Sequence, residues 1–165
     1  MKKLVITLTF ALAISTGMVS AQSTFQAILS GLNEVGPNAS PGTGVGSVVL
    51  NAAQTQITVN ESWSGVTSAV TASHIHTGAF GVNGGVTFGF TGVPATTTGA
   101  IPEQSFSITP AQVATLFAGG MYMNVHTTGI PGGEIRGQLS LVPEPAAASL
   151  LGLGLATLAL RVRRK

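Results

Sequence analysis

The chain has 165 residues and a formal net charge of +2 at neutral pH, and it contains no cysteine. Six of its seven Lys and Arg residues lie in the first three and last five positions, so residues 22–142 carry one Arg against four Glu. This acidic segment has no basic patch and few aromatic side chains, which excludes nucleic acid as a partner, and the missing thiols exclude disulfides and thiolate ligands.

The first 21 residues have the three parts of a secretory signal peptide. Met1-Lys2-Lys3 is basic, residues 4–18 are mostly apolar, and Val19-Ser20-Ala21 is a cleavage site of small residues. We therefore expect signal peptidase to cut after Ala21, so that the mature chain begins near Gln22. The alternative is an N-terminal helix that stays attached to the protein.

Residues 22–142 form one predicted domain, in which short alternating runs are separated by Gly, Pro, Asn and Ser. In one of these runs Ile57, Val59 and Trp63 alternate with polar side chains, which is typical of a half-buried strand. A segment of about 120 residues can bury a core without cross-links. The pattern predicts an antiparallel all-β fold, either a sandwich or a closed Greek-key barrel. The expected strands are residues 24–31, 46–51, 54–63, 70–77, 85–90, 104–108, 121–127 and 134–142.

One segment breaks the strand pattern and predicts a short helix. Thr109 is a good N-cap, Pro110 suits the first helical position, and Gln112 completes a capping box. Apolar side chains then recur on one side as far as Phe117, and Gly119 is a suitable stop. We expect this helix of about two turns to cover one end of the sheet and to have no catalytic role.

Two of the three histidines of the chain lie in one predicted strand. His74 and His76 are two residues apart in the strand 70–77, so both rings project from the same face, and Val70 is expected to continue that face. Two imidazoles arranged in this way can share a metal ion.

The third histidine lies in another predicted strand, residues 121–127. There His126 shares a face with Tyr122 and Asn124. If the two histidine-bearing strands are neighbours, three neutral imidazoles converge, a ligand set that suits copper or zinc with one position left open. The alternative is a polar cluster in which the imidazoles bond to backbone carbonyls and hold loops in place.

Glu134 and Arg136 are the charged residues closest in sequence to the histidine pattern, and they point to one face of the strand 134–142. One interpretation is that Glu134 accepts a hydrogen bond from a metal-binding imidazole and orients it. The favoured interpretation is an ion pair between Glu134 and Arg136, because few other charges exist in the domain.

The C-terminal segment, residues 143–165, has the features of a sorting signal. Pro143-Glu144-Pro145 precedes an apolar run, residues 146–160, and a basic end, residues 161–165. As a helix the run reaches about 22 Å, which only marginally spans a hydrocarbon core of ~30 Å, and its basic end would stay on the cytoplasmic side. The segment resembles the PEP-CTERM signal of exported bacterial proteins. That resemblance implies transient anchoring in the inner membrane and cleavage near Pro143, Glu144 and Pro145 by an exosortase-type protease, which releases the protein to the cell surface or extracellular matrix.

Four stretches of the mature segment together resemble a known family. They are the run from Phe25 to Val35, His74-Ile75-His76-Thr77-Gly78, the run from Tyr122 to Thr127 and the run from Pro131 to Leu139. In their order and spacing they resemble the CHRD domain, a module named after chordin. The resemblance implies an immunoglobulin-like β-sandwich or barrel, distantly similar to Cu/Zn superoxide dismutases, and it implies no settled activity.

Two function classes follow from these observations. The favoured one is a non-enzymatic protein of the cell surface or matrix whose candidate chemistry is metal binding by His74, His76 and His126. Its neutral polar strands also suggest exopolysaccharide as a partner, although such a surface also suits any soluble exported protein. The alternative is a copper-dependent redox enzyme with dismutase-like chemistry. That site uses four histidines where this chain has three, and an acidic domain lacks the positive field that attracts superoxide.

Overall fold

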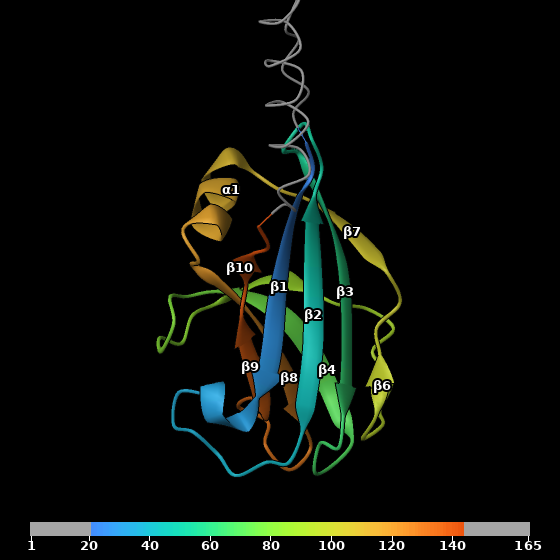
Figure 1. The fold of residues 1–165 in the computed structure, drawn as a ribbon. Helices are drawn as coiled ribbons and strands as arrows, with labels where there is room; N and C mark the ends of the chain where they lie inside the picture. Colours follow the sequence, from blue (N-terminus) through green and yellow to red (C-terminus); the bar gives the residue numbers. More distant parts are fainter. Residues whose placement is uncertain (1–20, 144–165) are drawn as a thin grey trace, which may run out of the picture.

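The computed structural model describes residues 21–143, and the fold is almost entirely β-structure with one short helix, as the sequence predicted (Figure 1). Both the predicted signal peptide, apart from Ala21, and the sorting segment beyond Pro143, including Glu144 and Pro145, lie outside the described residues. No helix among residues 21–143 is long and apolar enough to cross a membrane. The elements in chain order are β1 (Ser23–Ser30), η1 (Gly31–Asn33), β2 (Thr43–Leu50), β3 (Gln56–Ser64), β4 (Val70–Thr77), β5 (Val86–Gly89), β6 (Gly99–Ala100), β7 (Gln104–Ser107), α1 (Pro110–Phe117), β8 (Met121–Thr127), β9 (Ile135–Gln138) and β10 (Ser140–Leu141).

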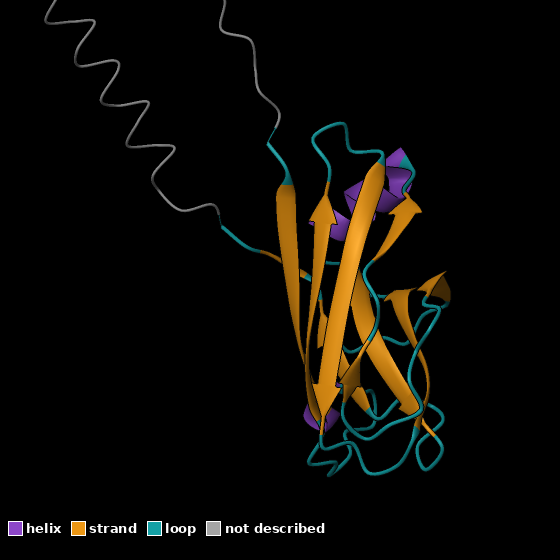
Figure 2. Cartoon of the chain, turned by 90° about the vertical axis from the view of Figure 1, so that its right-hand side faces the viewer, coloured by secondary structure: helices purple, strands orange, loops and turns teal. Residues whose placement is uncertain are grey.

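All the strands belong to one antiparallel sheet. Its order is β5-β4-β8-β9-β1-β2-β3-β6, with β10 also paired to β1 and β7 to β3. The sheet curls over, so that β1, β2 and β3 lie in front of β4 and β8 (Figure 1), and α1 and η1 lie at opposite ends (Figure 2). The described strands therefore form one continuous half-barrel, which confirms the antiparallel all-β class, while the sandwich or closed Greek-key barrel stays a prediction.

Alternating side chains along the strands fill the inside of the curl. On β1, Phe25, Ala27 and Leu29 are buried while their neighbours point outward. The inner faces of the two halves of the sheet meet in a single apolar core. Burial of each large apolar side chain contributes roughly 1.5–3 kcal/mol, so the alternating pattern both forms the strands and closes the sheet.

Strand β2 begins three residues earlier than the sequence suggested, at Thr43. Its first half contains glycine on the inner face, which usually weakens a strand. Here the space is used by a neighbour, because a Cβ atom on Gly46 would lie 2.0 Å from Sδ of the fully buried Met123. The glycine therefore belongs to the strand and leaves room for the methionine from β8.

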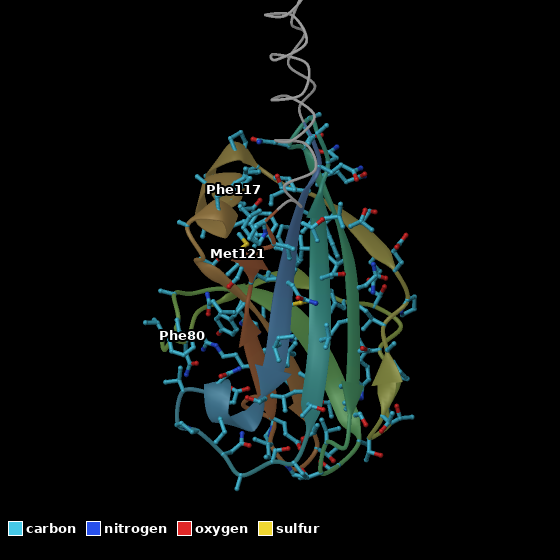
Figure 3. All side chains as sticks on the ribbon, viewed as in Figure 1. Phe80, Phe117 and Met121 are labelled. Atoms are coloured by element: carbon cyan, nitrogen blue, oxygen red, sulfur yellow. The ribbon has the colours of Figure 1, made fainter. Side chains whose placement is uncertain are left out.

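The helix has the predicted start. The Thr109 hydroxyl accepts a hydrogen bond from the backbone N–H of Gln112, and the Gln112 side chain accepts one from the Thr109 backbone N–H, which completes the capping box. Phe117, at the α1 end of the molecule (Figure 3), packs edge-to-face on Phe25 with ring centroids 5.1 Å apart. The helix then ends before Gly119, which has a positive φ of 68°. It covers one end of the core, as expected.

Candidate metal centre

The two histidine-bearing strands, β4 and β8, are neighbours in the sheet. Their register places His76 opposite Tyr122, His74 opposite Asn124 and His126 opposite Ala72. The three histidines therefore share the outer face of the sheet, whereas the intervening residues of β4 face the core. The predicted neighbourhood of these strands is confirmed.

Val70 does not continue the histidine face, which corrects the sequence-based expectation. The register between β4 and β8 shifts between Val70 and Ala72, where the strand has an irregularity. An extra residue in one strand reverses the alternation beyond it. Val70 consequently lies in the core with 2% of its surface exposed, and the histidine face begins after the shift.

The three imidazoles converge. Ring centroids are 5.0 Å apart for His74 and His126, 5.5 Å for His74 and His76, and 5.8 Å for His76 and His126. Each ring offers one nitrogen, and these nitrogens all lie within 4.8 Å of one another. This is the only group of three or more metal-binding side chains found within residues 21–143.

Backbone carbonyls fix the protonation of two of the rings. Nδ1 of His76 lies 3.0 Å from the carbonyl oxygen of Gly84, and Nδ1 of His126 lies 3.0 Å from that of Pro131. Since a carbonyl can only accept, each Nδ1 carries the proton and donates it, and in the neutral ring Nε2 keeps its lone pair. Both rings are therefore held in the tautomer that binds metal through Nε2.

The nitrogens left over are buried and have no partner. They are Nδ1 of His74, Nε2 of His76 and Nε2 of His126. A buried polar atom without a hydrogen bond costs about 1–3 kcal/mol, so such atoms are rare and call for an explanation. Three of them on one cluster are explained if a bound cation accepts all three lone pairs.

The surroundings keep the imidazoles neutral. Burial, followed by the charges of His126 and His76, lowers the pKa of His74 to about 4. Burial also lowers the pKa of His76 against the opposing hydrogen bond to Gly84, and the charges of His126 and Arg136 lower it a little further. Burial lowers the pKa of His126 as well, against the opposing hydrogen bond to Pro131. Because a metal binds only the deprotonated ring, these shifts favour a metal over protons at neutral pH.

The cluster fits a small transition metal ion. Tetrahedral zinc with Zn–N bonds of about 2.0–2.1 Å needs nitrogens roughly 3.3 Å apart, so imidazole nitrogens within 4.8 Å of one another have to close by at most about 1.5 Å. His74 has no hydrogen bond to hold its ring, so it can make this adjustment. Three neutral nitrogen ligands without a carboxylate suit copper or zinc and are a poor set for magnesium or calcium.

Glu134 has neither of the roles that the sequence suggested. Its fully buried carboxylate accepts hydrogen bonds from the Ser40 hydroxyl at 2.6 Å, the Thr67 backbone N–H at 2.6 Å and the Thr127 hydroxyl at 2.5 Å. These donors lower the pKa of Glu134 against the effect of burial, which raises it. The imidazoles use carbonyl acceptors, so Glu134 orients no ring directly.

Arg136 is likewise not paired with Glu134, so the expected ion pair is wrong. The buried guanidinium donates to the carbonyls of Ala79 and Val82 and to Oδ1 of Asn83, all on the loop between β4 and β5. Its Cζ atom also lies 3.4 Å from the centre of the Tyr122 ring. The guanidinium therefore has loop carbonyls and the Tyr122 ring as its partners in place of the expected Glu134 carboxylate.

Asn124 supports the site from the middle of the same face. Its Nδ2 donates to the carbonyl of Ile135 at 3.1 Å and to Oε1 of Glu34 at 2.5 Å. Burial raises the pKa of Glu34, while the bond from Asn124 and the charge of Arg136 oppose that rise. No pattern in the sequence linked Glu34 to the histidines. Glu34 follows η1, about 90 residues before Asn124, and the two side chains meet only in the folded protein.

The comparisons with known proteins agree with both resemblances. The CHRD domain model matches residues 25–139, and the PEP-CTERM protein-sorting motif matches residues 141–165. No curated protein and no solved structure matches the chain. The PEP-CTERM motif indicates export and cell-surface sorting through an exosortase. Since the domain model covers more than half of the chain, this protein belongs to the CHRD domain family.

Proposed function

We propose that this protein binds a transition metal ion, copper or zinc, at the cell surface through His74, His76 and His126, and that it is not an enzyme. The observation that carries the proposal is the convergence of three buried imidazole nitrogens that have no hydrogen-bond partner. Nε2 of His76, Nε2 of His126 and Nδ1 of His74 would hold the ion. A bound ion would supply a Lewis-acidic centre with a coordination position that the protein leaves open.

Export and sorting would bring the protein to the cell surface or extracellular matrix, where it would bind the metal ion. We propose that signal peptidase removes residues 1–21 and that the apolar run 146–160 anchors the chain briefly in the inner membrane. An exosortase would then cut near Pro143, Glu144 and Pro145 and release residues 22–142 to the surface or extracellular matrix. The sorting motif supports the second half of this route.

A second candidate is copper-dependent redox chemistry of the dismutase type, which the convergence of the histidines also favours. The electrostatics favour it less. Arg136 is the one basic residue of residues 22–142, and only 1% of its surface is exposed. Superoxide would therefore meet an acidic surface without a positive field to guide it to the site. The likeness to immunoglobulin and dismutase folds stays a prediction, and metal binding does not depend on it.

Exopolysaccharide stays a proposed matrix partner. A groove of about 550 Å³ on the outer face of the sheet is lined by the polar residues Gln26, Asn33 and Ser140 and by apolar ones that include Ile28, Phe80 and Leu141. Phe80 is 72% exposed on the loop that projects from the side of the sheet (Figure 3). The Gln26 amide can hydrogen-bond to a sugar that stacks on the exposed Phe80 ring, which supports this partner class.

Isothermal titration of Cu(II), and separately of Zn(II), into the full chain in mild detergent tests the metal proposal. We expect one ion per chain, and loss of that binding in the double variant His74→Ala and His76→Ala. Thr24→Ala, an exposed position on β1, is the matched control and should bind like the wild type. Equal heats for the wild type and the double variant would leave the histidines as structural residues. If copper binds, a superoxide assay then separates the redox candidate from the favoured one.

A further inference from the structure

Glu134 and Arg136 lie two residues apart, are buried, and bond to different loops. Glu134 holds the segment after β8, because its carboxylate accepts from Thr127, whose hydroxyl in turn accepts from the N–H of Ile130. The Glu134 backbone also takes part, since its N–H donates to the Val125 carbonyl at 2.8 Å. Pro131, whose carbonyl orients His126, lies within this segment.

Arg136 holds the loop between β4 and β5 in the same manner. Its two terminal nitrogens bond to Ala79, Val82 and Asn83, three positions of that loop. The next residue, Gly84, carries the carbonyl that orients His76. Each buried charge therefore helps to fix the loop that supplies a carbonyl to one imidazole, and Glu134 in addition accepts hydrogen bonds from Ser40 and Thr67 outside its loop.

A stack of side chains connects Arg136 to the same histidine by a second route. The guanidinium lies over the Tyr122 ring at 3.4 Å, and the Tyr122 ring is nearly parallel to His76, with an interplanar angle of 6° and centroids 4.9 Å apart. The Tyr122 hydroxyl also accepts the backbone N–H of Gly84 at 3.1 Å. Arg136 thus restricts the orientation of the His76 ring through Tyr122, and it also fixes the loop whose Gly84 carbonyl accepts the hydrogen bond from Nδ1 of His76.

We infer that Glu134 and Arg136 are positioning residues of the metal centre, Arg136 for His76 and Glu134 for His126. Each acts through a loop carbonyl that keeps its imidazole in the tautomer with Nε2 turned to the cluster. Neither residue touches the metal. The inference rests on the proposed metal function. It adds that each charge controls a different imidazole, which a purely structural role for the two charges does not require.

Nitrogen-15 NMR of the metal-free full chain in detergent provides the direct test, because the nitrogen shifts and their two-bond couplings to the carbon-bound ring protons distinguish an Nδ1–H from an Nε2–H imidazole. We expect Nδ1–H for both His76 and His126 in the wild type. Arg136→Met, which keeps an unbranched apolar side chain but removes the guanidinium over Tyr122, should give a mixture of tautomers at His76 and leave His126 unchanged. Glu134→Gln should do the reverse, so each variant is the control for the other.

Zinc titration of the same samples supplies the second readout. Loss of an orienting partner typically lowers metal affinity about 10–100-fold, and we expect a loss at the lower end of that range for each variant. Arg136→Lys, which keeps the charge but reaches fewer loop atoms, should fall between Arg136→Met and the wild type.

Two results would overturn the inference. One is an unchanged tautomer and zinc affinity in a folded Arg136→Met protein; the other is an equal effect of both variants on both rings, which would mean a general loss of structure. If either variant fails to fold, Asn83→Ala and Ser40→Ala each remove one bond of the two networks and make the same comparison. If the wild type binds no metal, the proposed function fails, and the tautomers alone decide whether the loops position the rings.

Discussion

His74 and His126 lie on neighbouring strands with ring centroids 5.0 Å apart, and each turns a buried nitrogen without a hydrogen bond into the same cluster. His126 is held by the Pro131 carbonyl, whereas no such bond holds His74. Two of the three rings are therefore set in place before a metal arrives, and the third is free to close on it.

Metal addition should stabilise the protein, because an ion that binds only the folded state shifts the unfolding equilibrium. At a hundredfold excess over Kd the gain is about 2.7 kcal/mol, which corresponds to a rise in Tm of roughly 10 °C for a domain of this size. Thermal unfolding followed by the fluorescence of Trp63, with zinc and then with EDTA, measures it. His74→Ala should remove the rise, and a similar rise in that variant would contradict the proposed ligand set.

Gly84→Ala should weaken metal binding about tenfold or more and lower stability. A Cβ atom at Gly84 would lie 1.6 Å from the Thr77 carbonyl oxygen, so the loop has to move and take with it the carbonyl that orients His76. Gly85→Ala is the matched control, because a Cβ atom there meets nothing within 4 Å. Zinc titration and thermal unfolding of both variants check this prediction, which equal affinities would contradict.

A carboxyl group in the core should make stability depend on pH. Glu61 is buried on β3, and burial raises its pKa to about 7 against the opposing hydrogen bond to Ser73. The Ser73 hydroxyl has a single proton, and it also lies 3.1 Å from the Asn124 carbonyl, which can only accept. A protonated Glu61 can donate to Ser73 while Ser73 donates to Asn124, so both bonds form only with the neutral acid.

The folded state therefore binds a proton at Glu61 that the unfolded state has released. This contribution to stability is complete below pH 4.5 and is lost as the pH rises to about 7, on the order of 3 kcal/mol in total. The lowered pKa of His74 acts in the opposite direction, since its stability contribution is lost as the pH falls from 6.5 to about 4. Glu61→Gln keeps a hydrogen-bond donor for Ser73 but cannot ionise. It therefore separates the contribution of Glu61 to the pH dependence of stability from that of His74.

Urea unfolding at pH 4.5, 6 and 8 measures the difference between the wild type and Glu61→Gln. We expect the variant to gain stability relative to the wild type as the pH rises through this range, because an amide cannot ionise. A constant difference between the two proteins across the range would show that Glu61 titrates normally.

Thr109→Ala should cost about 1 kcal/mol and lower Tm by roughly 4 °C, because the helix loses its N-cap. The helix lies at one end of the core and contacts none of the histidines through an observed bond. Zinc affinity should therefore stay at the wild-type value. Thr24→Ala, on an exposed strand position, is the control for the loss of a threonine side chain. A large fall in zinc affinity would mean that α1 is coupled to the site.

Local patterns were enough to predict most elements. Alternation identified the strands around Phe25, Val59 and Met123, and Thr109 with Gln112 identified the start of α1. The two-residue strand β6 was missed because two residues are too few to show a period. The early start of β2 at Thr43 was missed because Gly44 looks like a strand breaker in the sequence, whereas in the fold a Cβ atom there would lie 2.8 Å from the Ser62 carbonyl oxygen of the neighbouring strand.

Sequence by itself determined the sorting motif, the alternating strands, the capped helix and the two histidines on one face of β4. These features depend on residues within a few positions of one another, so composition and periodicity carry them. Only the tertiary structure decided that His126 joins the pair, because that requires the register between β4 and β8. It also decided that Glu134 and Arg136 bond to separate loops and not to each other. Glu134 accepts from Ser40 and Thr67 and Arg136 donates to Val82, and these partners are distant in the chain, so no local pattern could show them.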